Sequence, residues 1–336
     1  FPFSVCSNSI CSTDVEPFML TGFAGMLIVA QFPVRFWERW AILFYASALI
    51  ALALVLFFGL EAKGATRWLN LGFARFQPSE MAKIAVPMMV SAYLSRRLIP
   101  PKLKHVAGAL LIVAIPAFLI IRQPDLGTSI LVFASGFFVL FLAGLRKRYL
   151  AGAFLSSLAA APLLWIYVMR DYQKQRVLTL LSPEDDKFGA GWNIIQSTTA
   201  IGSGGLSGKG WTEGTQSQLN FLPESHTDFI IAVLAEEFGL LGVIGLCCIY
   251  LLLVGYCMII AINAQSQFAR LMAGSISLTF FIYMFVNMSM VSGLLPVVGV
   301  PLPLVSYGGS AIVTLFFGFG ILMAISSEPK RIGSWR

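Results

Sequence analysis

The chain has 336 residues, of which 57% are hydrophobic and only 12% are charged. Soluble domains carry about 25% charged residues, so this composition excludes an ordinary water-facing surface. The formal net charge of +7 fits loops that lie against anionic lipid, and it gives no reason to expect a nucleic-acid partner.

Apolar runs of membrane-spanning length recur along the chain, since about 17–25 residues cross a bilayer as a helix. Alternating ten-residue segments, the mark of a transmembrane β-barrel, are absent. The sequence therefore predicts an all-α polytopic membrane protein with a single membrane domain over residues 1–336. Nine spans are expected, at residues 17–33, 41–60, 79–95, 106–121, 127–145, 149–168, 228–262, 270–293 and 304–326.

Basic residues predict the orientation, because lysine and arginine gather in the short cytoplasmic loops of membrane proteins. Here they fall in alternate connections without exception. These residues are Arg35, Arg39, Arg96, Arg97, Lys102, Lys104, Arg146, Lys147, Arg148, Arg270, Lys330, Arg331 and Arg336. The opposite face then holds residues 61–78, the large extracytoplasmic loop 169–227 and a proline-rich turn, 294–303.

The loop 169–227 is long enough to indicate a functional role. Its residues 172–181 and 191–201 have helical character, and the glycine-rich strip GSGGLSGKG, residues 202–210, follows them. The strip does not match a P-loop, which needs Gly-x-x-x-x-Gly-Lys-Ser/Thr. Two interpretations stay open: backbone N–H groups beside Lys209 could cradle an anion such as a diphosphate, or the strip is a flexible surface turn.

Ionisable residues inside spans are costly, so each is a candidate functional residue. Glu80 and Lys83 stand three residues apart on one helical face and can pair, which serves a structural role at least as well as a catalytic one. Asp125 precedes a helix expected to begin near Gly127 and can cap it.

Arg67 and Trp68 lie in the segment 61–78. Trp68 is either an anchor at the membrane interface or a surface on which a sugar ring stacks.

Asp228 stands where the large loop meets an apolar run, in the stretch FLPESHTDFIIAVLAEEFG. Helix capping is one use for it, although Thr227 would serve as well. Partial burial raises the pKa of a carboxylate, and it would make Asp228 a competent general base near neutral pH. Glu236 lies eight residues further on, about 12 Å deeper along a helix. That separation is too large for a pair of catalytic carboxylates, so we expect Glu236 to be structural or to contact another helix.

Several long motifs of this chain occur in the same order in a known family. They are RWLNLGFARFQPSEMAKIA, QPDLGTSI, KQRVLTLLSPEDDKFGAGWNIIQS, AIGSGGLSGKGWTEGTQSQLNFLPESHTDFIIAVLAEEFGLLG and LLPVVGVPLPLVSYGGSA. Over residues 17–330 the chain resembles the SEDS (shape, elongation, division and sporulation) family, and most of all its members from the rod-elongation machinery. These are ten-helix membrane glycosyltransferases that polymerise lipid II into peptidoglycan glycan strands. Nine spans are visible here, and the first helix of the family is expected to be absent.

The resemblance implies a reaction and a set of site residues. The 4-hydroxyl of an acceptor GlcNAc would attack the anomeric carbon of a donor MurNAc, with inversion and with undecaprenyl diphosphate leaving. The aspartate of the family motif that matches ESHTDF corresponds to Asp228, the catalytic candidate. The substrate-binding candidates are Trp68 of the RW pair, Glu80 and Lys83 of the Glu/Lys pair, Asp125, and the basic residues Arg67, Lys174, Arg176 and Lys209, which could offset the diphosphate charge.

The resemblance also implies partners and a location. A class B penicillin-binding protein, which is a transpeptidase, is the expected partner, together with other membrane proteins of the elongation complex and membrane lipid. The expected location is the bacterial cytoplasmic membrane, with several passes and an extracytoplasmic catalytic face. A divalent cation, Mg²⁺ or Mn²⁺, could also help to offset the diphosphate charge, although no ligand cluster is evident in the sequence.

Two other functions compete with polymerisation. A lipid II flippase would need a polar pathway across the bilayer, which Glu80, Lys83, Glu236 and Glu237 could line. It would not explain a large loop that ends at Asp228, and broken helices in matched halves are not evident. A non-catalytic membrane scaffold would leave the interfacial acid without a role.

Overall fold

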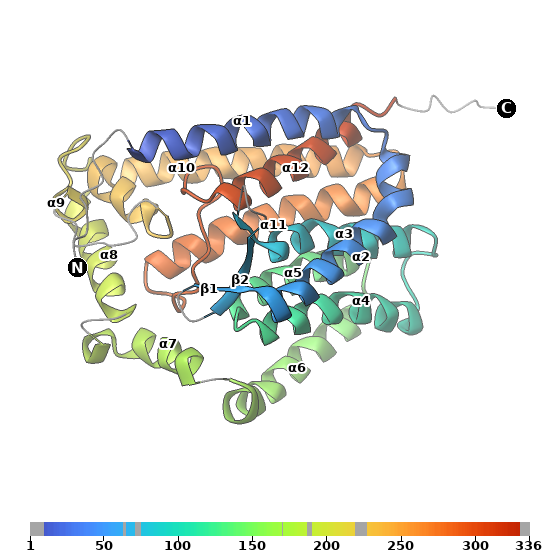
Figure 1. The fold of residues 1–336 in the computed structure, drawn as a ribbon, viewed down its shortest axis with the longest axis horizontal. Helices are drawn as coiled ribbons and strands as arrows, with labels where there is room; N and C mark the ends of the chain where they lie inside the picture. Colours follow the sequence, from blue (N-terminus) through green and yellow to red (C-terminus); the bar gives the residue numbers. More distant parts are fainter. Residues whose placement is uncertain are drawn as a thin grey trace. The chain divides into compact units, whose positions relative to one another are not determined.

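The computed structural model describes residues 10–62, 65–70, 75–169, 171–186, 190–218 and 227–329. Within these ranges, nine long helices occupy the positions of the nine predicted spans (Figure 1). They are α1 (Ile10–Gln31), α2 (Val34–Phe58), α3 (Pro78–Ser95), α4 (Leu103–Arg122), α5 (Leu126–Leu142), α6 (Lys147–Leu163), α10 (Ile230–Asn263), α11 (Gln267–Val291) and α12 (Gly309–Ser326). The predicted all-α membrane fold is confirmed.

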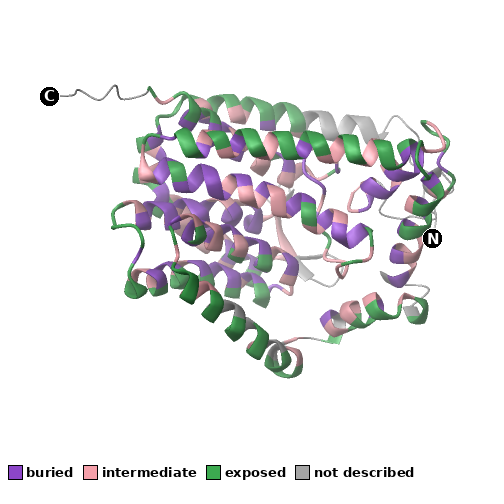
Figure 2. Cartoon of the chain, turned by 180° about the vertical axis from the view of Figure 1, so that it is seen from behind, coloured by how far each residue is buried: buried purple, intermediate pink, exposed green. Residues whose placement is uncertain are grey.

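The long helices expose apolar side chains, as those of a membrane protein do. Among the described residues, α2, α4, α10, α11 and α12 are long and apolar enough to cross a bilayer. Large apolar side chains on them lie exposed, such as Phe57 at 79% and Leu252 at 75%. Figure 2 shows exposed positions running along the helices, with buried positions on other faces. Exposed apolar side chains of this kind are stable against lipid.

Contacts between residues divide the chain into two compact units, which we describe separately. Unit 1 comprises Phe1–Ala143, Val254–Phe280 and Tyr307–Arg336. Unit 2 comprises Gly144–Leu253 and Phe281–Ser306. The single domain over residues 1–336 stays a prediction.

Unit 1 is organised around α3, which packs against α2, α4 and α5, while α1 packs along α12. Close packing depends on small residues: a Cβ atom at Gly136 of α5 would lie 2.3 Å from Val113 of α4 and 3.0 Å from Val86 of α3. Small residues at helix contacts allow backbones to approach where no hydrophobic effect drives association.

A small antiparallel sheet in unit 1 was not part of the sequence prediction. Its strands are β1 (Leu60–Ala62), β2 (Ala65–Asn70) and β3 (Arg75–Phe76), in the order β1-β2-β3. Strands of two to six residues are too short for a visible alternation of apolar and polar residues. The sheet leads into α3 and carries Arg67 and Trp68 on β2.

Unit 2 contains the large loop, residues 169–227. Helices α7 (Asp171–Leu181) and α8 (Ala190–Gly204) confirm the two predicted helical stretches. A 3₁₀ turn, Pro183–Asp186, and the short α9 (Thr215–Gln218) complete its regular structure within the described residues. The part of the loop at 219–226 lies outside the described residues.

Helix α10 is interrupted at Gly239, where φ is 66° and ψ is −165°. Such a break removes intrahelical hydrogen bonds, and an unpaired backbone group costs several kcal/mol in lipid. The glycine-rich strip supplies new partners on both sides of the break. Its N–H groups donate to carbonyls of α10, from Lys209 to Glu236 at 3.0 Å and from Gly210 to Glu237 at 3.0 Å.

The same strip also accepts hydrogen bonds from α10, on the far side of the break. Leu240 N–H donates to the carbonyl of Gly205 at 3.0 Å, and Leu241 N–H donates to that of Leu206 at 3.2 Å. The strip therefore pairs with the helix as ordered backbone. Neither interpretation of the sequence, an anion cradle or a flexible turn, predicted this pairing.

Glycine is required where the two backbones meet. A Cβ at Gly208 would lie 2.1 Å from the Glu237 carbonyl oxygen, and one at Gly204 would lie 2.0 Å from that of Ala235. Gly239 has a positive φ, and its Cβ would lie 2.3 Å from the nitrogen of Gly208. Both close approach and backbone conformation exclude larger residues at this junction.

We expect Gly239→Ala to destabilise the protein by about 2–4 kcal/mol, because it adds left-handed strain and an overlap with the strip. Thermal unfolding of the purified protein in detergent measures the change. Gly245→Ala on the same helix is the matched control, since a Cβ there meets nothing within 4 Å. Equal melting temperatures for the two variants would contradict the role of Gly239.

Candidate active site

Asp228 lies in a turn, residues 227–229, that leads directly into α10 in unit 2. The next residue, Phe229, is buried at 1% exposure and anchors the turn, whereas Asp228 is half-buried. The carboxylate of Asp228 faces Gly299, because a Cβ built on Gly299 would lie 3.4 Å from Oδ2. Gly299 has φ +77°, a backbone conformation that favours glycine.

Asn287 of α11 holds the backbone on both sides of this contact. Its Nδ2 donates to the carbonyl oxygen of Asp228 at 2.9 Å and to that of Val300 at 2.7 Å. The side chain is completely buried. Thus a single amide ties the entrance of α10 to the residue after Gly299.

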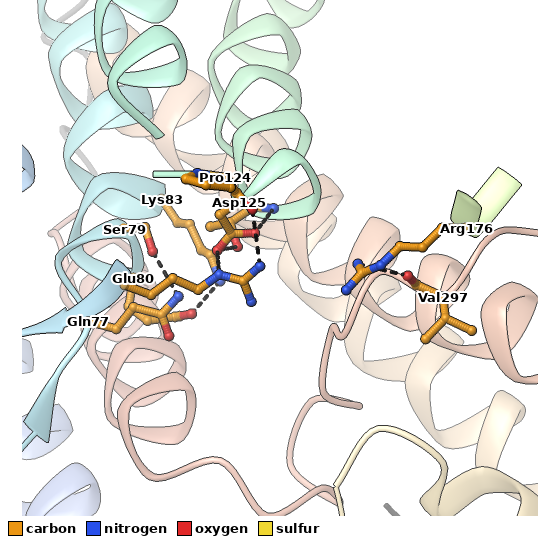
Figure 3. Close-up of polar contacts among 10 residues, drawn as sticks. Gln77, Ser79, Glu80, Lys83, Pro124, Asp125, Arg176 and Val297 are labelled. Carbon is orange, nitrogen blue, oxygen red and sulfur yellow. Dashed lines mark hydrogen bonds and ion pairs between the residues drawn. The ribbon is translucent and has the colours of Figure 1, made fainter. Parts of the chain in front are cut away.

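Val300 belongs to the proline-rich stretch between α11 and α12, which we call the 294–306 segment. Further ties hold it within unit 2. Arg176 of α7 donates from Nη1 to the carbonyl of Val297 at 3.0 Å (Figure 3). The hydroxyl of Tyr250 donates to the carbonyl of Pro303 at 2.5 Å.

The last tie of the 294–306 segment reaches the turn that carries Asp228. Ser306 Oγ accepts from the N–H of Leu302 at 2.8 Å and donates to the carbonyl of Thr227. A half-exposed carboxylate that is fixed in this way by its main chain is suited to act as a preorganised general base.

A second group of candidates lies in unit 1. Asp125 caps α5, as predicted, since Oδ1 accepts from the N–H of Thr128 at 3.3 Å and Oδ2 accepts from its hydroxyl at 2.8 Å. Arg67 Nε lies 3.3 Å from Asp125 Oδ2, and Arg67 Nη2 donates to the carbonyl of Pro124 at 3.3 Å. Figure 3 shows Pro124 and Asp125 at the start of α5. The guanidinium therefore already has an anionic partner.

The predicted pair of Glu80 and Lys83 is confirmed on α3, with Lys83 Nζ 2.6 Å from Glu80 Oε1 (Figure 3). Both side chains are buried. Such a pair is nearly neutral, and removal of either partner would leave a buried charge. Their role in substrate binding stays a prediction, as does that of the half-buried Trp68.

Glu236 and Lys209 form an ion pair in unit 2, with Nζ 2.7 Å from Oε1. Glu236 is completely buried, and it also accepts from the N–H groups of Thr215 and Gln216 at the start of α9. The structural role expected for Glu236 is confirmed, although its partners come from the loop. Lys209 is thus engaged within the protein, and its assignment to a diphosphate stays a prediction, as does that of the half-buried Lys174 on α7.

Sequence reasoning missed Asn287, Gly299, Tyr250 and Ser306. It examined ionisable groups in the spans, whereas these residues are neutral. The available signal was an amide within the apolar run YMFVNMSMV, because a buried amide must find hydrogen-bond partners.

Lys209→Met should lower the free energy of unfolding by about 3 kcal/mol, because it leaves the buried Glu236 carboxylate without a cation. Adding Glu236→Gln should recover most of that loss, since the amide needs no counter-charge. Chemical or thermal unfolding of the two single variants and the double variant measures the coupling. Strictly additive losses would contradict the ion pair.

Comparison with known proteins shows similarity along nearly the whole chain. The sequence model of the FtsW, RodA and SpoVE family, described as "Cell cycle protein", matches residues 7–331. The peptidoglycan glycosyltransferase MrdB of Escherichia coli K12 is 56% identical over 311 residues, which cover 93% of this chain and 84% of that protein. A probable peptidoglycan glycosyltransferase FtsW of Geobacter metallireducens is 38% identical over 318 residues, covering 93% and 84%.

Solved structures agree with the sequence relatives. A chain from a peptidoglycan synthase complex, described as coordinating polymerization and crosslinking, superimposes with a TM-score of 0.83 at 28% identity, covering 96% of this chain and 91% of that one. The rod shape determining protein RodA of Thermus thermophilus has a TM-score of 0.72 at 27% identity, covering 96% and 89%. The chain therefore belongs to the FtsW/RodA/SpoVE family, the family that its motifs resemble.

Proposed function

We propose that this chain is a peptidoglycan glycosyltransferase that polymerises lipid II into glycan strands during cell elongation. The single observation that carries the proposal is the half-buried Asp228 carboxylate, whose backbone is clamped to the 294–306 segment. The names of the E. coli and Geobacter relatives support the same activity.

In the proposed reaction the 4-hydroxyl oxygen of the acceptor GlcNAc bonds to the anomeric carbon of the donor MurNAc. The bond from that carbon to the diphosphate oxygen breaks, undecaprenyl diphosphate leaves, and the configuration inverts. Asp228 accepts the proton of the attacking hydroxyl. A positioned general base contributes about 10²–10⁴-fold to such a step.

The leaving diphosphate needs positive charge near it. Three candidates, Lys174, Arg176 and Lys209, lie in the unit that contains Asp228, and Arg176 is tied to the 294–306 segment that also contains Gly299. Arg67 has its charge offset by Asp125, and Lys209 has its charge offset by Glu236. We assign the diphosphate first to Lys174 and Arg176 of α7, because Arg176 contacts the segment that faces Asp228.

A cofactor is not part of the proposed mechanism. Among the described residues, no three His, Cys, Asp or Glu side chains gather as metal ligands. A bound Mg²⁺ or Mn²⁺ ion would help to offset the charge of the substrate diphosphate, and no step is routed through it.

The proposed location is the bacterial cytoplasmic membrane, with Asp228 on the extracytoplasmic side. The alternation of basic loops supports this orientation, and lipid-linked sugars would meet Asp228 where headgroups adjoin acyl chains. The proposed partner is a class B penicillin-binding protein, which crosslinks the strands. Similarity to a chain of a complex that couples polymerization and crosslinking supports this partner.

The flippase alternative depended on polar residues lining a pathway. Glu80 and Lys83 neutralise each other, and Glu236 is paired with Lys209. Residues committed to such pairs are poor candidates for a polar pathway, so the arrangement favours the glycosyltransferase.

Asp228→Asn should abolish polymerisation, with a loss of at least about 100-fold, because the amide cannot accept the proton. The measurement compares glycan polymer made from labelled lipid II by the purified protein with its partner transpeptidase. Asp185→Asn, an exposed acid of the same loop, is the matched control and should keep full activity. Melting temperature and partner binding must be unchanged in both variants.

Normal polymer from Asp228→Asn would place the base elsewhere. If the unmodified complex made no polymer but moved lipid II between the leaflets of liposomes, the flippase would replace the glycosyltransferase. The Lys209→Met/Glu236→Gln variant also tests Lys209. If the double variant is stable but inactive, Lys209 is again a candidate for binding the substrate.

A further inference from the structure

We propose that Asn287 is a positioning residue for Asp228, which directs the catalytic carboxylate by holding the main chain around it. The inference rests on the proposed function, in which Asp228 is the general base. Asn287 does not touch substrate in this proposal and acts only through the turn that carries Asp228.

The chemistry of the amide explains why asparagine stands at this position. Its one nitrogen carries two N–H groups, and both have a carbonyl acceptor, that of Asp228 at 2.9 Å and that of Val300 at 2.7 Å. The two carbonyl partners also fix which end of the amide is nitrogen. An aspartate in its place would face two oxygens without a proton to donate, and a leucine would leave two carbonyls unpaired.

Both hydrogen bonds of the Asn287 amide hold backbone next to the Asp228 carboxylate. At one end the amide holds the backbone of Asp228 itself. At the other it holds Val300, the neighbour of Gly299, against which Asp228 Oδ2 lies. The amide therefore holds in place the two backbone segments that lie on either side of the carboxylate. A displacement of about 1 Å in a reacting group can cost about 100-fold in rate.

A purely structural role for Asn287 makes a different prediction. The 294–306 segment has other ties that do not involve this amide, from Arg176 to Val297, from Tyr250 to Pro303 and from Ser306 to Thr227. These ties should keep the segment folded when the amide is removed. Loss of rate in a folded protein would then report the position of the carboxylate.

The test uses the full chain with its partner transpeptidase and measures kcat and KM for lipid II, melting temperature and substrate binding. Asn287→Leu should lower kcat about 10–100-fold while KM stays within about twofold, because the base moves and the substrate contacts remain. Ser292→Ala, one residue beyond the end of α11, is the control, since its hydroxyl donates to the carbonyls of Met288 and Ser289 in α11. It should match the unmodified protein.

Gly299→Ala gives a second approach, because it adds left-handed backbone strain and a methyl group 3.4 Å from Asp228 Oδ2, and it removes no side-chain hydrogen bond. It should lower kcat in the same way. Combining it with Asn287→Leu should cost less than the product of the two single effects, since both changes displace one carboxylate.

A wild-type kcat in folded Asn287→Leu would overturn the inference. If Asp228→Asn is inactive in the same assay, the proposed function still holds. A rate loss that disappears after normalisation to folded protein would also overturn it. If Asn287→Leu does not fold, Gly299→Ala decides, and a wild-type kcat there refutes the positioning role. Full activity of Asp228→Asn would instead refute the proposed function itself.

Discussion

Backbone N–H and C=O groups must find partners wherever a chain leaves the helix in apolar surroundings. Unit 2 meets this constraint at two places. The break of α10 at Gly239 is paired by the glycine-rich strip, and the 294–306 segment is paired by side chains that reach its carbonyls. Irregular backbone is stable beside apolar helices in both places because its N–H and C=O groups have hydrogen-bond partners there.

The same constraint decides the use of the buried charges. Glu236 neutralises Lys209 and also receives the first N–H groups of α9, so that one carboxylate organises the loop beyond the strip. Glu80 and Lys83 neutralise each other as a local ion pair within α3. Charges that first suggest a pathway or a substrate site thus have partners within the fold.

Local chemistry explains which features could be predicted from the sequence. The spans follow from the length of apolar runs, the cap at Asp125 from its place before a helix, and the Glu80–Lys83 pair from its spacing. The partners of Asn287 are 59 and 13 residues away, and no local pattern marks them. Glycines in the strip indicate a close approach but do not indicate which segment approaches, so the pairing with α10 appears only in the structure.

Asp228 and Glu236 lie near the start of one helix, yet the fold holds them in opposite ways. Glu236 is held through its carboxylate, whose oxygens accept from Lys209 and the start of α9, and it has no exposure to a substrate. The clamp from Asn287 holds Asp228 through its carbonyl and takes neither carboxylate oxygen. A neutral amide on the main chain can therefore fix the position of a base without occupying either oxygen of its carboxylate.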